Sequence, residues 1–453
     1  MKKSVLLIGG AFVGFVASML PGCAPHATVA APTAATKIDP TATPLPPFDP
    51  PRPGVESMNT EYYIGSAAQE TAAFEAFAKQ IQAIQDQQGK SHGQPTQRGF
   101  HAKAHGCLTG RFQLYPDRDP RTRFGVFTDD SKPMPVWARF SNGVGWQQSD
   151  GELDARGMAI KVMGVPGTKL SDEETQTQDF LMTNSPTPVG RNGFDFMKFA
   201  EANSHGKVSG LMFAAGHPRA AGPALSGTAP ITSAAAEQYW SGGAYHLGAH
   251  QTVKFTAKPC SFDRARHPDG SGDNRLAQDL SVAATQGFCF VFYVQFQSDA
   301  FRTPIENASR EWSEQDAPLV PVGKLQFLPQ DVNQPGRAEF CKNLSYNPWH
   351  SIAAHQPMGN INHARRYVYS SSRQYRQGAQ EPFDFAGFGP ATATTDKHSA
   401  THNVPAADAS WAFALEQRVR DQQYQPTPAE VERYQNIAAQ LQTATTAPAT
   451  GAP

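Results

Sequence analysis

The run FCFVFYVQF at residues 288–296 is the strongest indicator of the fold class. Aromatic and β-branched residues dominate this run, and both kinds of residue are enriched in strands. Similar short runs occupy residues 136–141, 157–163, 252–257 and 322–328, with Gly, Pro, Asn and Asp between them. Many short strands with few helices between them predict a β-barrel or a β-sandwich.

Helical patterns flank these strands on both sides. One apolar helix face is predicted by five residues at helical spacing: Phe74, Phe77, Ala78, Ile81 and Ile84. Near the other end, Thr427-Pro428-Ala429-Glu430 is a capping box with proline at the first helical position. Residues 361–377 fit either a helix or an irregular segment. The fold class expected from these patterns is α+β.

The composition excludes several classes of protein. The 453 residues include 39 Lys plus Arg and 40 Asp plus Glu, so the formal charge is −1. A nucleic-acid-binding surface normally needs a clear basic excess, and nucleic acid is therefore not expected as a partner. Charged residues make up only 17% of the chain, which argues against solenoids and coiled coils. The 28 phenylalanines are enough for one large core.

The N-terminus has the pattern of an export signal. Lys2 and Lys3 precede a largely apolar run at residues 5–20, which ends in Leu20-Pro21-Gly22-Cys23. The end of this run resembles the bacterial lipobox, in which the cysteine becomes the lipidated N-terminus; ordinary cleavage nearby and an uncleaved anchor are the alternatives. We expect residues 1–23 to be a signal peptide and the protein to be exported to the periplasm or cell envelope. A lipid anchor would be its contact with the membrane.

Composition also predicts the domain boundaries. Residues 24–56 are rich in Pro, Ala and Thr and are expected to be a linker. Residues 57–395 form the main domain, and residues 396–453 form a C-terminal helical segment with a disordered tail. Four cysteines remain beyond Cys23, so disulfides are possible but not implied. Cys289 lies within an apolar run, which favours a buried thiol there.

A tyrosine between two arginines is the first candidate for chemistry. In a helix, Arg365, Tyr369 and Arg376 would lie along one face. Two guanidinium groups beside a phenol favour its ionised form. A phenolate is a known ligand of haem iron, and an arginine can bind a haem propionate through two hydrogen bonds. The alternative is a solvated surface helix.

Two histidines form the second candidate. His101 and His105 have the spacing of a zincin motif, but Ala102 replaces the glutamate of that motif. In a strand the two rings would lie about 13 Å apart, too far to share one metal ion. The remaining interpretations are an acid/base at His101 beside a cofactor and a core histidine.

Five segments resemble the catalase family, in the order that the family uses and across about 280 residues. They are Arg98-x-x-His101-Ala102-Lys103, Arg139-Phe140-Ser141, Asp154-Ala155-Arg156-Gly157-Met158-Ala159-Ile160-Lys161, the stretch from Asp179 to Pro186 followed by Arg191 and Phe196, and Arg365-x3-Tyr369-x6-Arg376. Residues 304–312 and 347–350 resemble the compact catalase-like haem proteins of bacteria. The resemblance implies an antiparallel β-barrel, with surrounding and C-terminal helices, and one b-type haem.

The resemblance also implies a role for each matching residue. Tyr369 would be the iron ligand, and Arg365 would keep it ionised. The haem propionates would be bound by Arg98, Arg139 and Arg376. Phe196 would stack on the haem face. On the distal side, His101 would act as acid/base and Ser141 would orient it. Thr183 falls at the position of the family's distal asparagine in an ungapped alignment, but we expect its neighbour Asn184 to supply that amide.

The implied function is that of a haem-dependent hydroperoxidase, which reduces hydrogen peroxide or an organic hydroperoxide. Pro188 and Val189 replace the two phenylalanines that narrow the catalase channel, so a wider pocket is expected. The alternatives are a non-catalytic haem-binding or sensing lipoprotein and a haem-free β-barrel enzyme. The sequence leaves open the peroxide, the electron donor and the oligomeric state.

Overall fold

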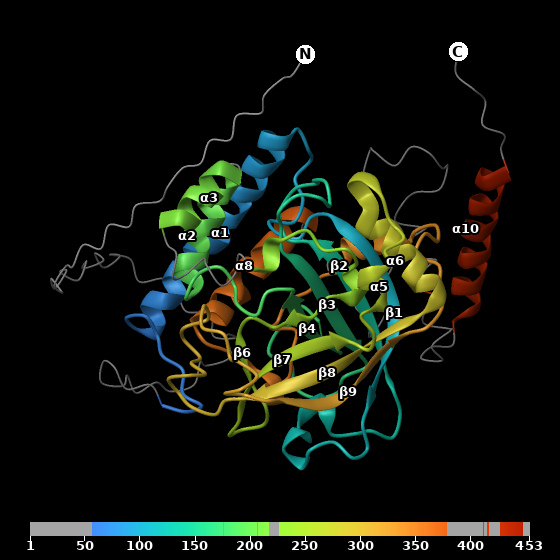
Figure 1. Ribbon diagram of the computed structural model, residues 1–453. Coiled ribbons are helices and arrows are strands. Elements are labelled where there is room, and N and C mark those ends of the chain that lie inside the picture. Colours follow the sequence, from blue (N-terminus) through green and yellow to red (C-terminus); the bar gives the residue numbers. More distant parts are fainter. Residues whose placement is uncertain are drawn as a thin grey trace, which may run out of the picture. The chain divides into compact units, whose positions relative to one another are not determined.

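Eight strands form a closed antiparallel barrel (Figure 1). The computed structural model describes residues 57–174, 176–205, 207–216, 226–377, 411, 415 and 426–446. The strands are β1 (Ala104–Leu114), β2 (Met134–Asn142), β3 (Arg156–Met163), β4 (Thr177–Thr183), β5 (Tyr239–Trp240), β7 (Thr252–Pro259), β8 (Phe288–Phe296) and β9 (Leu319–Phe327). Their order around the barrel is β7-β5-β4-β3-β2-β1-β9-β8, and pairing of β7 with β8 closes it. The short strands β6 (Ala244–His246) and β10 (Pro357–Met358) extend the sheet beyond β7.

The interior of the barrel is a packed aromatic core. Its phenylalanines include Phe112, Phe127, Phe140, Phe180, Phe255, Phe290 and Phe292, all at most 1% exposed. Successive residues of a strand point to opposite faces of the sheet. Since Phe140, Met158 and Phe180 point inward, their strand neighbours point to the outer face of β2, β3 and β4.

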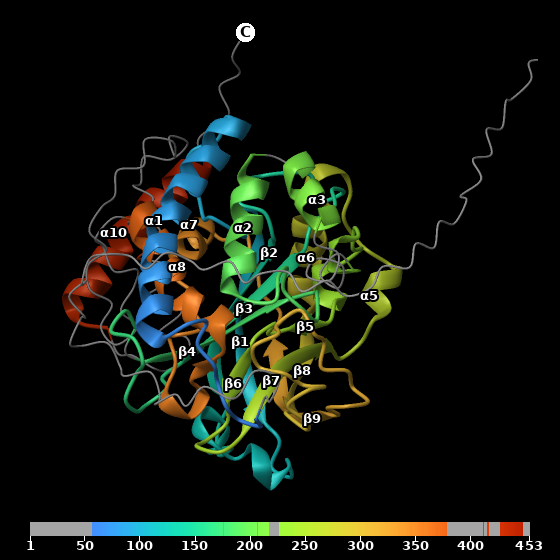
Figure 2. The same ribbon diagram turned by 90° about the vertical axis from the view of Figure 1, so that its left-hand side faces the viewer.

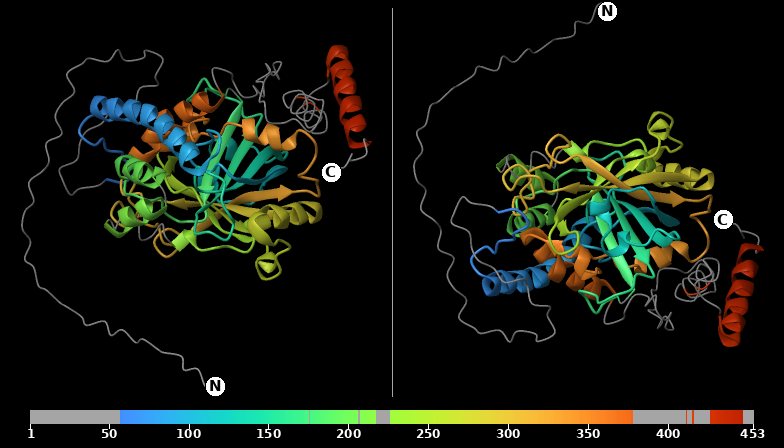
Figure 3. Two further views of the ribbon diagram at one scale, coloured as in Figure 1. Left: turned by 90° about the horizontal axis from the view of Figure 1, so that it is seen from above. Right: turned by 90° about the horizontal axis from the view of Figure 1, so that it is seen from below.

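The described part of the chain also contains several α-helices. The helices are α1 (Ala67–His92), α2 (Gly193–Ser204), α3 (Lys207–Gly216), α5 (Asp263–Arg266), α6 (Arg275–Gln286), α7 (Arg337–Asn343), α8 (Asn360–Gln377) and α10 (Pro428–Thr446). Short 3-10 helices span Pro120–Thr122, Gly125–Phe127, Ser226–Thr228, Ala234–Ala236, Gly272–Asn274 and Ala353–His355. Helices α1, α2 and α8 pack against one another beside the barrel (Figures 2 and 3).

Local signals explain where two of the helices begin. Ser66 caps α1 by accepting a hydrogen bond from the backbone N–H of Gln69, and Gly93 ends the helix at φ 61°. The capping box predicted before α10 is present, because Thr427 and Glu430 accept hydrogen bonds from each other's backbone N–H groups. Residues 361–377, for which the sequence left two interpretations, are helical within α8.

The structure corrects one prediction about the cysteines. Cys289 is not a free thiol, because it forms a disulfide with Cys260, and Cys107 forms a second one with Cys341. Cys107 and Cys341 are 234 residues apart in the sequence, so their pairing could not be predicted from their spacing. The predicted signal peptide, linker and disordered tail lie outside the described residues. None of the described helices is long and apolar enough to cross a bilayer.

Candidate functional site

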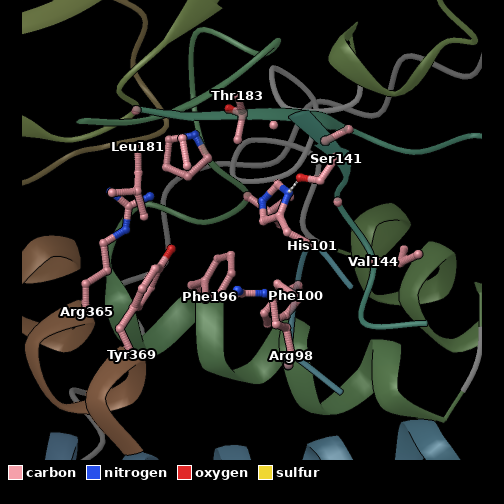
Figure 4. A pocket seen from close by; sticks show the side chains of 18 of the residues that line it. Arg98, Phe100, His101, Ser141, Val144, Leu181, Thr183, Phe196, Arg365 and Tyr369 are labelled. Carbon is pink, nitrogen blue, oxygen red and sulfur yellow. Dashed lines mark hydrogen bonds between the residues drawn. The ribbon is translucent and has the colours of Figure 1, made fainter. Parts of the chain in front are cut away.

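A cavity of about 460 Å³ lies between the outer face of the barrel and the helices α1, α2 and α8. Its lining includes Ile81 from α1, Phe196 from α2 and Tyr369 from α8. Figure 4 shows Phe196 and Tyr369 facing Leu181 and Thr183 of β4 across one open space. The volume is in the range of small-molecule and cofactor pockets.

Strand register determines which side chains of the barrel reach the cavity. Ser141, Gly157 and Thr183 are direct neighbours across β2, β3 and β4, and all three line the cavity. Two residues further along each strand, on the same outer face, Arg139, Ala159 and Leu181 form a second row that also lines the cavity. Small side chains therefore dominate the first row, and this leaves room for a group that enters from the neighbouring loop.

His101 is the group that occupies this room. Its backbone has a φ of 59°, which is uncommon for any residue but glycine and typical of functional sites. The backbone N–H of His101 donates to the carbonyl of Gly143 over 2.8 Å, and a guanidinium nitrogen of Arg139 donates to the carbonyl of His101, also over 2.8 Å. Nδ1 of His101 lies 3.1 Å from Oγ of Ser141. These contacts fix both the position and the orientation of the ring.

Two features make His101 suited to accept a proton. Its ring lies directly over Gly157, where any Cβ atom would come within 2.6 Å of it. Burial, and then the positive charge of Arg139, lower the pKa of His101 to about 4. The imidazole is therefore neutral at physiological pH.

Three arginines form a cationic wall at another side of the cavity: Arg98, Arg139 and Arg376. Burial lowers the pKa of Arg98 to about 10, and burial together with Arg98 lowers that of Arg139 to about 9. Burial, Arg98 and Arg139 also lower the pKa of Arg376. Among the described residues, these guanidinium groups donate to backbone carbonyls rather than to carboxylates. Nε of Arg139 is buried and has no acceptor within the described part of the chain. Such a wall is suited to an anionic ligand.

Helix α8 contributes the tyrosine. Tyr369 and Arg365 lie one helical turn apart, and the guanidinium carbon of Arg365 lies 5.9 Å from the centre of the Tyr369 ring. Figure 4 shows the hydroxyl of Tyr369 directed into the open space, with Phe196 beside it. The ring of Phe196 packs at 5.2 Å from that of Phe100. Of the predicted residues, the structure thus brings together Arg98, His101, Arg139, Ser141, Phe196, Arg365, Tyr369 and Arg376.

Asn184 is the exception, and its predicted position in the cavity is wrong. Its Oδ1 accepts a hydrogen bond from the buried backbone N–H of Arg156 over 2.7 Å, and its side chain is absent from the cavity lining. Thr183 lies in the lining instead, because consecutive residues at the end of β4 point to opposite faces. The residue in the cavity is therefore Thr183, one position before the asparagine that we predicted there.

The structure also adds a residue that the sequence did not indicate. Tyr346 lines the cavity, is buried, and has a hydroxyl without a hydrogen-bond partner. Burial, followed by the negative charge of Asp179, raises its pKa. The chain around Tyr346 has no periodicity that could have revealed it; the motif Asn347-Pro348-Trp349-His350 that follows is the nearest signal.

The zinc interpretation of His101 and His105 finds no support. His105 is buried outside the cavity lining, 3.8 Å from Asp150. In the described part of the chain, the cluster with metal-ligand spacing consists of Glu174, Asp179 and His350, and Nζ of Lys161 already pairs with both carboxylates of that cluster.

Comparisons of sequence place this chain near the catalases. The family model described as Catalase matches residues 66–212. A curated relative, the catalase of Latilactobacillus sakei, is 24% identical over 309 residues, which cover 62% of this chain and 62% of that protein. The chain therefore spans less than two thirds of the length of this relative.

Comparisons of structure give the same fold. A bacterial catalase superposes with a TM-score of 0.50 at 17% identity, covering 73% of this chain and 65% of the other. A fungal catalase has a TM-score of 0.52 at 18% identity, covering 78% and 72%. Catalase A from Saccharomyces cerevisiae has a TM-score of 0.52 at 18% identity, covering 77% and 74%. The predicted barrel with surrounding helices is confirmed.

Proposed function

We propose that this chain, which is similar to the catalases in sequence over residues 66–212 and in fold, is a haem-dependent hydroperoxidase that acts on hydrogen peroxide or an organic hydroperoxide. One observation supports the proposal above all. His101, a neutral histidine with a strained backbone, faces the same cavity as Tyr369, whose ring lies beside Arg365. The histidine lies in the loop before β1, and the tyrosine lies on α8. Residues held in strained backbone conformations cluster at active sites.

The residues of the cavity fit a b-type haem. Its two propionates would meet the cationic wall of Arg98, Arg139 and Arg376, whose hydrogen bonds otherwise end on carbonyls. The buried Nε of Arg139 lacks an acceptor, and a carboxylate would provide one. Phe196 would pack on the ring system, and Tyr369 would be the iron ligand, with the guanidinium group of Arg365 beside its ring.

The chain's own contribution to the chemistry is the control of one proton. When bound, the haem supplies a redox-active iron whose anionic ligand favours cleavage of the O–O bond. In the tautomer whose Nδ1–H is donated to Oγ of Ser141, 3.1 Å away, His101 would present an unprotonated Nε2 to the hydroperoxide. Nε2 takes the proton from one peroxide oxygen and returns it to the other, which leaves as water or an alcohol. Such a positioned acid/base contributes about 10²–10⁴ in rate.

The distal side of the cavity leaves room for the substrate. Pro188 and Val189 line it, at the positions where the sequence predicted a widened channel. We infer that a hydroperoxide larger than hydrogen peroxide can enter. Oxygen release from hydrogen peroxide by the purified protein would identify dismutation, while oxidation of a dye without oxygen release would identify a peroxidase.

Two substitutions with matched controls test the proposal. The purified full-length protein is expected to show a Soret absorption band. His101→Ala should lower turnover at least 100-fold and keep the haem, while the exposed His250→Ala should change neither. Tyr369→Phe should shift or abolish the Soret band, whereas Tyr375→Phe, on the same helix but bonded to Asp86 at the surface, should not. Full turnover in His101→Ala would contradict the proposal.

We propose further that the protein works in the periplasm or cell envelope, on the basis of its N-terminal sequence and its two disulfides. Residues 1–23 carry the export pattern, and two disulfides join described residues of the domain. Structural disulfides persist in oxidising compartments. Fractionation of cells, with mass analysis of the mature N-terminus, would show whether the chain is exported and whether Cys23 carries lipid.

A further inference from the structure

One short segment fixes two of the three arginines of the cationic wall. In this segment, residues 341–346, the chain leaves α7, and Ser345 and Tyr346 form part of the cavity lining. The carbonyl of Lys342 accepts hydrogen bonds from Arg98 over 3.0 Å and from Arg376 over 2.6 Å. The carbonyl of Leu344 accepts a second bond from Arg98 over 2.5 Å. The positions of these two carbonyls therefore direct both guanidinium groups.

A disulfide anchors the start of this segment. Cys341 is joined to Cys107 of β1, with their Cα atoms 5.9 Å apart and both residues at most 4% exposed. Cys107 is the direct cross-strand neighbour of Arg139, the third arginine of the wall. The disulfide thus connects the carbonyls that hold Arg98 and Arg376 to the strand pair that carries Arg139.

The surroundings explain why an anchor is needed there. Three guanidinium groups in one wall repel one another, and burial weakens the screening of that repulsion. The carbonyls orient the side chains but carry no full charge to neutralise them. Helix α7 is also only seven residues long, Arg337–Asn343, and such a short helix depends on tertiary contacts for its position.

We infer that the Cys107–Cys341 disulfide is a positioning element of the site that binds the cofactor's carboxylates, so that haem affinity depends on its oxidation. This inference rests on the proposed function. Without the bridge, α7 keeps only non-covalent contacts with the barrel, including the hydrogen bond from Nε of Arg337 to the carbonyl of Cys107 and the packing of Phe340 on Trp137. The carbonyls of Lys342 and Leu344 are then held less firmly relative to β1. The arginines then spread apart, and both propionates lose charge-assisted hydrogen bonds.

The second disulfide provides a matched control. Cys260 and Cys289 join the ends of β7 and β8, and neither they nor their chain neighbours occur in the described lining of the cavity. Their loss removes a cross-link of the barrel without touching the segment at residues 341–346.

The experiment compares two porphyrins on the full-length apoprotein. Haem carries both carboxylates, and its dimethyl ester carries none, so the ratio of their affinities reports on the arginine wall. We expect Cys107→Ser with Cys341→Ser to weaken haem binding about tenfold, measured by Soret titration, and to change ester binding less than twofold. Cys260→Ser with Cys289→Ser should leave both affinities within twofold of the wild type.

A chemical version covers the case in which the double variant does not fold. Folded wild-type apoprotein is treated with a water-soluble phosphine, which is oxidised to its oxide with an oxygen from water, while the disulfide takes up two electrons and two protons to give two thiols. The two bridges are distinguished by mass-mapping of the freed thiols. Loss of the Cys107–Cys341 bridge should reproduce the tenfold effect on haem alone.

Each remaining outcome has a defined meaning. Unchanged haem affinity after loss of this bridge would overturn the inference and leave the proposed function standing. A parallel loss of haem and ester affinity would also overturn it, because that shows a general opening of the fold. If the wild-type protein binds neither porphyrin, that result would contradict the proposed function and therefore also the inference that rests on it.

Discussion

Replacement of Gly157 by alanine places a methyl group where the ring of His101 now lies. The new Cβ atom would lie 2.6 Å from both Cε1 and Nδ1 of that ring, about 0.8 Å short of the 3.4 Å at which ordinary contact begins. It would also lie 3.1 Å from Oγ of Ser141. The ring cannot yield freely, since the carbonyl of Gly143 holds its backbone and Ser141 holds Nδ1. The imidazole must therefore move by nearly 1 Å.

A displacement of this size is enough to uncouple an acid/base from its substrate. Misplacement by about 1 Å typically costs on the order of 10²-fold in rate. We expect Gly157→Ala to lose peroxide turnover by that factor and to keep its haem, because the tyrosine and the arginine wall are unchanged. The assay is steady-state turnover normalised to Soret absorbance. Gly151→Ala is the control, because its Cβ would meet only Oγ of Ser149, at 3.6 Å.

Two results would refute this reasoning. Turnover within threefold of the wild type would show that the position of His101 does not limit the reaction. Loss of haem from Gly157→Ala would show that the methyl group occupies space needed by the cofactor rather than by the histidine.

Three further predictions concern charge and hydrogen bonding. Because burial lowers the pKa of His101 to about 4, kcat/KM should stay constant as the pH falls through 6.5 and decline only near pH 4; a midpoint near 6.5 would contradict this. Lys161→Met should destabilise the fold by about 3 kcal/mol in urea unfolding, since it removes the ammonium group shared by two buried carboxylates and leaves them His350 as their remaining cationic partner among the described residues, whereas the surface Lys258→Met should cost less than about 1 kcal/mol. Asn184→Leu should cost about 1–3 kcal/mol by removing the acceptor for the N–H of Arg156, with an unchanged haem spectrum; an altered spectrum would place Asn184 in the site after all.

Five strands of the barrel could be predicted because short runs of strand-forming residues stand between turn residues. The run at residues 288–296 and its four companions lie in strands of the structure, except for residue 328, which follows the end of β9. The strands β5, β6 and β10 could not be found in this way, since two or three residues show no periodicity. They matter nonetheless, because β5 connects β4 to β7 and so helps to close the barrel.

The site could be predicted where residue type alone is informative. An arginine, a histidine or a tyrosine in a family-like order already limits its own chemistry. Position on a strand is less secure, as Thr183 and Asn184 show, because one residue of register decides which face of the sheet a side chain occupies. Contacts between segments that are distant in the sequence could not be predicted. Nothing in the sequence joins Cys107 to Cys341 or places Tyr346 on the cavity wall.

The distribution of buried charge gives the strongest physical reason to expect an anionic cofactor. Elsewhere in the domain, the buried ammonium of Lys161 is neutralised by Asp179 and Glu174. In the cavity, backbone carbonyl oxygens orient the guanidinium groups of Arg98, Arg139 and Arg376. These carbonyls leave the positive charge of the three groups uncompensated. Folding without a ligand therefore retains a repulsion that two carboxylates would relieve. Because a ligand that binds only the folded state stabilises it, haem should raise the unfolding temperature, and its carboxylate-free ester should raise it less.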